Sequence, residues 1–212
     1  VYDGTTSATV SLTDNRLAGD TLTTSYTSAS FASKNVGTAK TVSVSGLALS
    51  GTDAANYTAN TTASAAADIT AKGLTVTGLA ANDKVYDATT SSTLNTASAA
   101  LLGVISGDTV TLSTASATGA FATKNAGTGK VVNVSGLSLS GVEASNYTLT
   151  QPTTTASISQ AGLTVTADNK TRAPGPANPT LSANYAGFVG GETLHTSGIT
   201  GSPALSTTST NL

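Results

Sequence analysis

The chain has 212 residues, with 9 basic and 11 acidic side chains and no cysteine, methionine or tryptophan. The missing cysteines exclude disulfides, thiolate metal sites and thiol catalysis, and the low, balanced charge provides no basic patch for nucleic acid. No apolar stretch reaches the length of a membrane-spanning helix, so we expect no such span. A composition rich in threonine, serine, alanine and glycine favours a secreted, extracellular protein of the bacterial cell surface.

One block of sequence occurs twice and organises the whole chain. Residues 31–57 return as residues 121–147, and 18 of the 27 positions are identical. Shorter matches flank the block, namely Val1–Asp3 with Val85–Asp87, Gly19–Thr21 with Gly107–Thr109, and Gly73–Thr77 with Gly162–Thr166. A repeat of this kind predicts a series of similar modules, each contacting its neighbours, rather than one enzyme domain.

The repeat also sets the expected module boundaries. We predict a first module over residues 1–72, without the lead strand that opens the second, and a second module over residues 73–160. The segment 161–212 departs from the repeat after its first strand. We interpret it as part of a third, different module.

Alternation of apolar and polar residues predicts short β-strands. Val42 and Val44 alternate with threonine and serine, and Val132 and Val134 do the same in the second copy. No sustained helical period occurs. The pattern favours an all-β fold of small immunoglobulin-like β-sandwich modules in a linear array, with β-grasp-like modules as the alternative.

A glycine interrupts this alternation at the same place in both copies. After Gly46 the apolar residues Leu47 and Leu49 continue on the opposite parity, and Gly136 precedes the same change. A phase change at glycine predicts a β-bulge or a bend in the strand.

Each copy also contains a Lys-Asn-x-Gly segment. We predict a tight turn at each, because asparagine tolerates positive φ and glycine adopts it freely. The residues concerned are Asn35, Gly37, Asn125 and Gly127. An isopeptide bond between lysine and asparagine is the alternative, and it requires a partner elsewhere in the chain beside a buried carboxylate.

The most fold-specific stretch contains a leucine four residues before an acid and a tyrosine four residues after it. This spacing resembles the tyrosine corner of immunoglobulin-like sandwiches. The acids and tyrosines are Asp53 with Tyr57 and Glu143 with Tyr147. We expect each tyrosine ring to enter the core and its hydroxyl to bond nearby backbone. In the β-grasp alternative, residues 53–56 form a short helical turn.

Residues for catalysis or metal binding are sparse. The single histidine, His195, has no visible catalytic partner, and the sequence contains no phosphate-binding loop, dinucleotide fingerprint or zinc spacing. We therefore expect neither enzyme activity nor a cofactor. Calcium at the module joints is the alternative, because acids occur near the joints at Asp68, Asp83, Asp87 and Asp168.

Several motifs together resemble a known family. The motifs Val-Tyr-Asp-Gly, Phe-x-x-Lys-Asn-x-Gly, Val-x-Val-x-Gly-Leu-x-Leu-Ser-Gly and Asn-Tyr-Thr resemble the YDG-type repeats of large secreted bacterial adhesins, which include filamentous-haemagglutinin-like proteins. From Gly162 the chain resembles the MBG (YGX-type) module that accompanies them, through Asn178-Pro179, Tyr185-x-Gly187-Phe188 and Gly191-Glu192. The segment Ala173-Pro174-Gly175 replaces the expected Tyr-Gly. The resemblance implies a secreted, non-enzymatic adhesin stalk or biofilm matrix segment, and it brings no catalytic or ligand-binding residues.

Three functional hypotheses follow. The first is a semi-rigid stalk whose modules are joined through the strands 73–77 and 162–166. The second is an extracellular filament subunit assembled by strand exchange, because an unfilled sheet edge invites a strand from another chain. The third is a repeat that binds host or matrix glycans, for which Tyr26 is the only clear candidate aromatic. Expected partners are neighbouring modules or copies of the chain itself.

Overall fold

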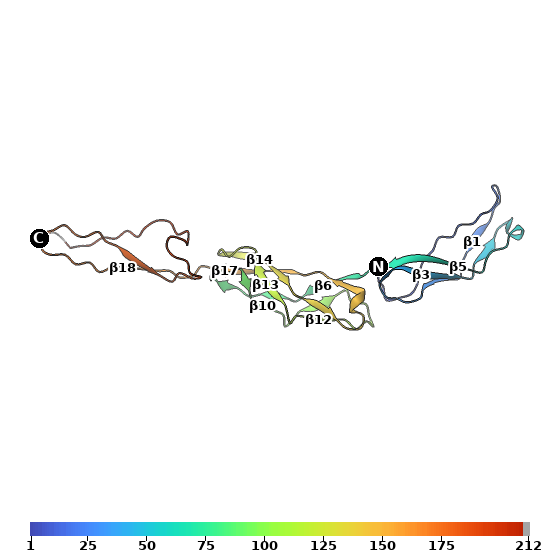
Figure 1. Ribbon diagram of the computed structural model, residues 1–212, viewed down its shortest axis with the longest axis horizontal. Coiled ribbons are helices and arrows are strands. Elements are labelled where there is room, and N and C mark those ends of the chain that lie inside the picture. Colours follow the sequence, from blue (N-terminus) through green and yellow to red (C-terminus); the bar gives the residue numbers. More distant parts are fainter. Residues whose placement is uncertain (210–212) are drawn as a thin grey trace. The chain divides into compact units, whose positions relative to one another are not determined.

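The computed structural model describes residues 1–209, and these residues form short β-strands connected by loops (Figure 1). The predicted all-β class is confirmed, and the helical residues lie in short 3-10 turns. No helix within residues 1–209 has the length and apolar character needed to cross a bilayer. The last three residues of the predicted third module, 161–212, lie outside the described residues.

Contacts divide the chain into two units, and the predicted second module contributes residues to both. Unit 1 contains Val1–Thr77, Ala99–Ala115 and Leu137–Gln151. Its sheets have the strand orders β2-β3-β5, β1-β4, β11-β6-β16 and β12-β15. The elements of unit 1 are β1 (Thr23–Ser25), β2 (Ser28–Phe31), β3 (Gly37–Ser45), β4 (Ala48–Ser50), η1 (Ala54–Asn56), β5 (Thr62–Ile69), β6 (Lys72–Thr77), β11 (Ala100–Leu102), β12 (Thr111–Ser113), β15 (Ser138–Ser140), η2 (Ala144–Asn146) and β16 (Tyr147–Leu149).

Strand β3 shows why the alternating sequence forms this sheet. It pairs antiparallel with both β2 and β5, and β3 and β5 can be followed side by side in Figure 1. Its alternate residues Val42 and Val44 are 1% and 3% exposed, and they pack against Ala29 of β2. Burying each valine stabilises the folded state by about 1.5–3 kcal/mol. Because successive side chains of a strand point to opposite faces, the two-residue period decides which face of β3 is buried.

The phase change at glycine is the point where the chain leaves one sheet for another. Gly46 lies between β3 and β4, which belong to different sheets, and its φ is 68°. A Cβ on Gly46 would lie 2.2 Å from Thr27 Oγ1. In the second copy Gly136 has φ 79°, and a Cβ there would lie 2.0 Å from the carbonyl oxygen of Ser116. Both positions therefore require glycine.

Unit 2 contains Gly78–Ser98, Ser116–Gly136 and the chain from Pro152 onward. Its largest sheet has the order β8-β17-β14-β13-β9, and β7 pairs with β10 while β18 pairs with β19. Its strands are β7 (Ala80–Ala81), β8 (Lys84–Val85), β9 (Ser91–Ser92), β10 (Leu94–Asn95), β13 (Thr118–Phe121), β14 (Gly127–Ser135), β17 (Thr153–Ser159), β18 (Thr164–Ala167) and β19 (Ala183–Ala186). The core beneath β14 consists of Phe121, Val132, Ala156 and Ile158.

The Lys-Asn segments connect the strands of antiparallel pairs, β2 to β3 and β13 to β14. The expected positive φ is wrong for all four residues concerned, Asn35, Gly37, Asn125 and Gly127. The left-handed residues are instead Ala39, with φ 49°, and Gly129, with φ 57°. Each lies at a register shift in β3 or β14. The bulge, rather than the loop, is therefore where the backbone departs from ordinary geometry.

Candidate functional site

A buried carboxylate gathers side chains from distant parts of unit 1. Asp108 Oδ2 accepts hydrogen bonds from the hydroxyls of Tyr2 at 2.7 Å and Tyr147 at 2.6 Å. Asp108 Oδ1 accepts a hydrogen bond from Lys34 Nζ at 2.8 Å. The Asp108 side chain is only 2% exposed. We call Tyr2, Lys34, Asp108 and Tyr147 the first joint cluster, because it ties the first repeat to residues of the second.

Backbone pairing and apolar packing hold this cluster in place. The amide of Tyr2 donates to the carbonyl oxygen of Thr70 at 2.8 Å, which fixes the start of the repeat beside the end of β5. The rings of Tyr2 and Tyr147 meet edge to face, with centroids 5.4 Å apart and an interplanar angle of 76°. Both rings belong to a buried cluster with Ile69 and Leu74. Three different segments therefore converge on one carboxylate.

The electrostatics of the cluster favour a permanent ion pair. The pKa of Asp108 is lowered to about 2, mainly by the hydrogen bond from the Lys34 ammonium and next by the hydrogen bond from the Tyr147 hydroxyl. Asp108 in turn raises the pKa of Lys34 above its usual range. Lys34 Nζ also lies 5.8 Å from the centroid of the Tyr2 ring, within range of a cation–π interaction. Burial raises the pKa of both tyrosines, so their hydroxyls remain donors at neutral pH.

A buried asparagine provides a second connection between the two repeats. Asn146, at the end of η2, is 2% exposed. Its Oδ1 accepts a hydrogen bond from the amide of Val36 at 2.9 Å, and its Nδ2 donates to Asn35 Oδ1 at 3.3 Å. The Lys-Asn loop of the first repeat is therefore bonded to the corner of the second.

The predicted corner residues make backbone hydrogen bonds, but to a different part of the chain than expected. The Tyr147 hydroxyl accepts a hydrogen bond from the amide of Ile105 at 3.1 Å. Glu143 accepts one from the amide of Thr109 at 2.8 Å. In the first repeat, Tyr57 bonds the amide of Leu17 and Asp53 bonds the amide of Thr21. The expectation of nearby backbone is wrong, because Tyr147 and Ile105 lie 42 residues apart. The short helical turn at these acids is present as η1 and η2.

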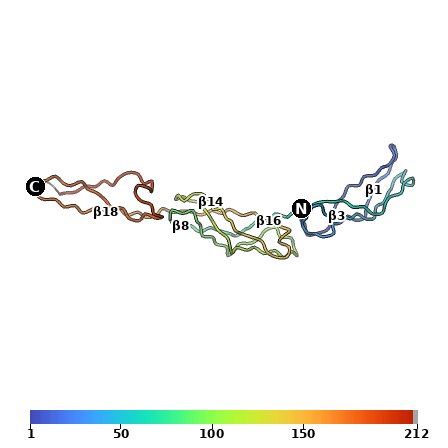
Figure 2. Tube along the Cα trace, in the orientation of Figure 1, coloured from blue at the N-terminus to red at the C-terminus, as the bar shows by residue number. Residues whose placement is uncertain are grey.

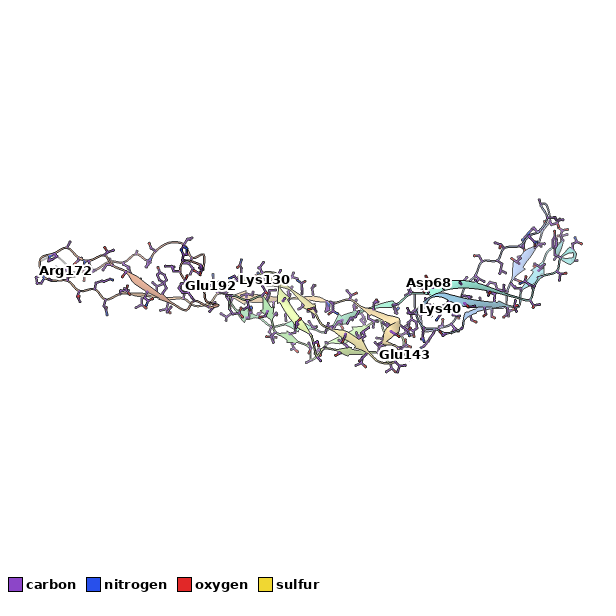
Figure 3. All side chains as sticks on the ribbon, viewed as in Figure 1. Lys40, Asp68, Lys130, Glu143, Arg172 and Glu192 are labelled. Atoms are coloured by element: carbon purple, nitrogen blue, oxygen red, sulfur yellow. The ribbon has the colours of Figure 1, made fainter. Side chains whose placement is uncertain are left out.

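Unit 2 contains an equivalent arrangement, whose acid Glu192 is labelled in Figure 3. Glu192 Oε1 accepts hydrogen bonds from the Tyr86 hydroxyl and from Lys124 Nζ, both at 2.6 Å. Lys124 Nζ lies 5.8 Å from the Tyr86 ring centroid. The amide of Tyr86 donates to the carbonyl oxygen of Ser159 at 2.8 Å, as Tyr2 does to Thr70. We call Tyr86, Lys124 and Glu192 the second joint cluster.

The lysine again dominates the electrostatics of the second joint cluster. The hydrogen bond from Lys124, and to a smaller extent the one from Tyr86, lowers the pKa of Glu192. Glu192 in turn raises the pKa of Lys124. The same tyrosine and lysine positions of successive repeats therefore bond an acid of the following segment. In both cases the acid follows a glycine, at Gly107-Asp108 and Gly191-Glu192. Sequence reasoning missed these pairings, and the recurring Gly-acid pair is the signal that could have indicated them.

The acids considered for calcium are used otherwise in the structure. Asp83 accepts from the amide of Ser157 at 2.6 Å, and Asp68 accepts from the amide of Ala39 at 2.7 Å. Asp87 pairs with Lys84 at 2.8 Å. Asp168 accepts from the Ser182 hydroxyl. Within residues 1–209, no three acidic or histidine side chains are grouped to hold a metal ion.

The remaining sequence candidates are also placed by the structure. The Lys34 and Lys124 ammonium groups bond carboxylates rather than the asparagine carboxamide that the isopeptide alternative needs. His195 is exposed. Tyr26 is not the exposed aromatic expected for glycan binding, because it is half-buried against Ala29, Val42 and Val44. Its hydroxyl accepts a hydrogen bond from the amide of Val10 at 3.4 Å.

Comparison with known families identifies similar domains along the chain. A family model described as YDG domain matches residues 1–65 and 70–156, and one described as MBG domain (YGX type) matches residues 163–211. No curated protein and no solved structure matches the chain. Both domain families are typical of extracellular repeat proteins.

Proposed function

This chain belongs to the YDG domain family, and we propose that it is a non-catalytic stalk segment of a secreted bacterial surface adhesin or biofilm matrix protein. The observation that carries the proposal is the repeated joint cluster. In each case a tyrosine and a lysine of one repeat bond an acid of the following segment. Using the same chemistry at successive joints suits a chain that must pass tension from module to module.

The physical character of the first joint cluster supports this role. Its carboxylate is almost wholly buried and receives three hydrogen bonds, one of them from a lysine. Charge-assisted bonds around a buried acid have narrow geometric requirements, so they fix the direction in which one module follows another. The apolar contacts of Tyr2 and Tyr147 exclude water from the same place. A joint of this kind resists bending more than a polar linker does.

Spin-label distance measurements test the stiffness of the first joint. The chain has no cysteine, so the pair Thr52→Cys and Val142→Cys can be labelled without other changes. Both positions are exposed and occupy equivalent places in the two repeats. We expect one narrow distance distribution, which broadens in the same labelled chain carrying Asp108→Asn. A broad distribution in the chain with native Asp108 contradicts the stalk proposal.

A glycan array provides the contrasting measurement. The stalk proposal places adhesion outside this segment, so the fluorescently labelled chain should bind no glycan above background. Saturable binding to one glycan class would favour the glycan-binding alternative. The Asp108→Asn chain serves as a control, because loss of the joint should not create or remove such binding.

A further inference from the structure

The fourth residue of each repeat lies against the loop that carries the joint acid. Gly4 and Ala88 are equivalent, each two residues after the tyrosine of its joint cluster. Both have a left-handed backbone, with φ 81° for Gly4 and 65° for Ala88. Ala88 follows β8, whose backbone is labelled in Figure 2. The two fourth residues therefore share one backbone conformation and differ by a single methyl group.

The loops that carry the two acids have the same length and the same framework. Residues 103–108 read Gly-Val-Ile-Ser-Gly-Asp, and residues 187–192 read Gly-Phe-Val-Gly-Gly-Glu. We call them the first and the second acid loop. In each loop the amide of the acid donates a hydrogen bond to the carbonyl oxygen three residues earlier, at 3.1 Å for Asp108 and 3.0 Å for Glu192. Each acid is therefore the last residue of a β-turn.

The two turns differ in the residue directly before the Gly-acid pair. In the second acid loop Gly190 and Gly191 have φ 60° and 75°. Positive φ at both central residues is the pattern of a type I′ turn. In the first acid loop Gly107 has φ 91°, but Ser106 does not have positive φ, so the turn has the pattern of type II. The second acid loop therefore uses glycine where the first carries a side chain.

The methyl group of Ala88 occupies the space that a side chain at residue 190 would need. A Cβ on Gly190 would lie 2.4 Å from Ala88 Cβ, a distance at which two carbon atoms overlap. Its next neighbours would be the carbonyl oxygen of Asp87 at 3.5 Å and Ala88 Cα at 3.7 Å, which are ordinary contacts. The Ala88 methyl group is thus the atom that excludes a side chain at residue 190.

At the first joint the fourth residue meets a different part of the acid loop. A Cβ on Gly4 would lie 3.0 Å from Ile105 Cγ2. Two carbon atoms are at their best separation at about 3.5–4.0 Å, so this contact would be too close. Ile105 packs against the buried cluster that contains Tyr2 and Tyr147, which limits its freedom to move away. Glycine at residue 4 therefore makes room for Ile105 beside the first joint cluster.

The two acids differ in length in the same sense as the fourth residues differ in size. Asp108, beside the joint with Gly4, bonds its tyrosine and lysine at 2.7 and 2.8 Å. Glu192, beside the joint with Ala88, bonds its own tyrosine and lysine at 2.6 Å. Glutamate has one more methylene group than aspartate, so its carboxylate reaches the same kind of partner from a backbone that stands farther away. The longer acid thus suits the joint in which a methyl group leaves the loop less room.

We infer that the fourth residue of a YDG-type repeat decides which acid loop can follow that repeat. Alanine at this position admits a loop with Gly-Gly-Glu and excludes one with Ile-Ser-Gly-Asp, whereas glycine presents no side chain for either loop to overlap. Specificity of this kind arises from a clash with the wrong partner. The inference rests on the stalk proposal and adds that the modules of the stalk cannot follow one another in any order.

A loop exchange tests the inference on the 212-residue chain. Residues 187–192 are replaced by Gly-Val-Ile-Ser-Gly-Asp, the sequence of the first acid loop, once with Ala88 and once together with Ala88→Gly. Nuclear magnetic resonance follows the exchange of the Lys124 ammonium protons with water, which slows when an acid holds the ammonium group. Lys34, in the unaltered first joint, is the reference in every sample.

With Ala88 present, the exchanged loop should leave Lys124 without its acid. We expect its ammonium protons to exchange at least about fivefold faster than in the unaltered chain, because the loop is held away by the overlap. Ala88→Gly in the same chain should restore slow exchange. The matched control is Ala88→Gly with the native loop, which should keep exchange slow because removal of a methyl group creates no overlap.

Three results would overturn the inference. They are slow exchange of Lys124 with the exchanged loop and Ala88, fast exchange that Ala88→Gly does not reverse, and fast exchange in the control with the native loop. The stalk proposal is tested separately, because the spin labels at residues 52 and 142 report on the first joint, which the loop exchange leaves unaltered.

Discussion

Replacing Asn146 by alanine should open the contact between the two repeats of unit 1. The carboxamide oxygen of Asn146 is the acceptor for the amide of Val36, at 2.9 Å, and the side chain is 2% exposed. Removing it leaves a part-buried donor without its acceptor, which costs about 1–3 kcal/mol. The bond to Asn35 is long, at 3.3 Å, and its partner is exposed, so it adds little.

The repeat supplies a matched control for this substitution. Asn56 occupies the same place at the end of η1 that Asn146 occupies at the end of η2, but Asn56 is exposed. Asn56→Ala should therefore change stability by less than about 0.5 kcal/mol. The two variants share the residue type, the 3-10 turn and a closely similar local sequence, so their difference isolates the tertiary contact.

Amide hydrogen exchange is the appropriate assay, because it reports the local unfolding of each segment of the chain separately. A loss of about 1–3 kcal/mol corresponds to roughly 5- to 150-fold faster exchange at Val36 and its neighbours in Asn146→Ala. Exchange in β14 of unit 2 serves as the internal reference. Unchanged exchange at Val36, or an equal effect of Asn56→Ala, would refute the reasoning that Asn146 connects the repeats.

Three further outcomes are expected. The pKa of Asp108 lies below its unfolded value, so the stability that the ionised carboxylate contributes is complete above about pH 4 and is lost as the pH falls toward about 2. In thermal unfolding followed by circular dichroism, the midpoint temperature should therefore decrease less across that pH window in Asp108→Asn than in the unaltered chain. Leu74→Ala removes a fully buried side chain and should cost about 2–5 kcal/mol in urea unfolding, whereas Leu102→Ala, at 61% exposed, should cost less than about 0.5 kcal/mol. Ala88 has φ 65°, and Ala88→Gly should raise stability by about 0.5–1 kcal/mol in calorimetry, so a lowered midpoint would contradict the strain argument.

The sequence by itself determined the strands and the places where they bend. Val42 and Val44 alternate with polar residues, and this local period selects one buried face whatever the rest of the chain does. The glycines at 46 and 136 mark a change of phase that no other residue would permit, because an added Cβ would overlap a neighbouring segment. Both features are visible as local patterns in the sequence, and they recur in both repeats.

Only the tertiary structure decided the partners of the joint clusters. Tyr2 bonds Asp108 across 106 residues and Lys34 bonds it across 74, and no local pattern connects positions so far apart. The contrast between Asn56 and Asn146 makes the same point, since one is exposed and the other buried in nearly the same local sequence. Local preference fixes backbone shape, whereas burial and ion pairing depend on which segment lies against each side chain.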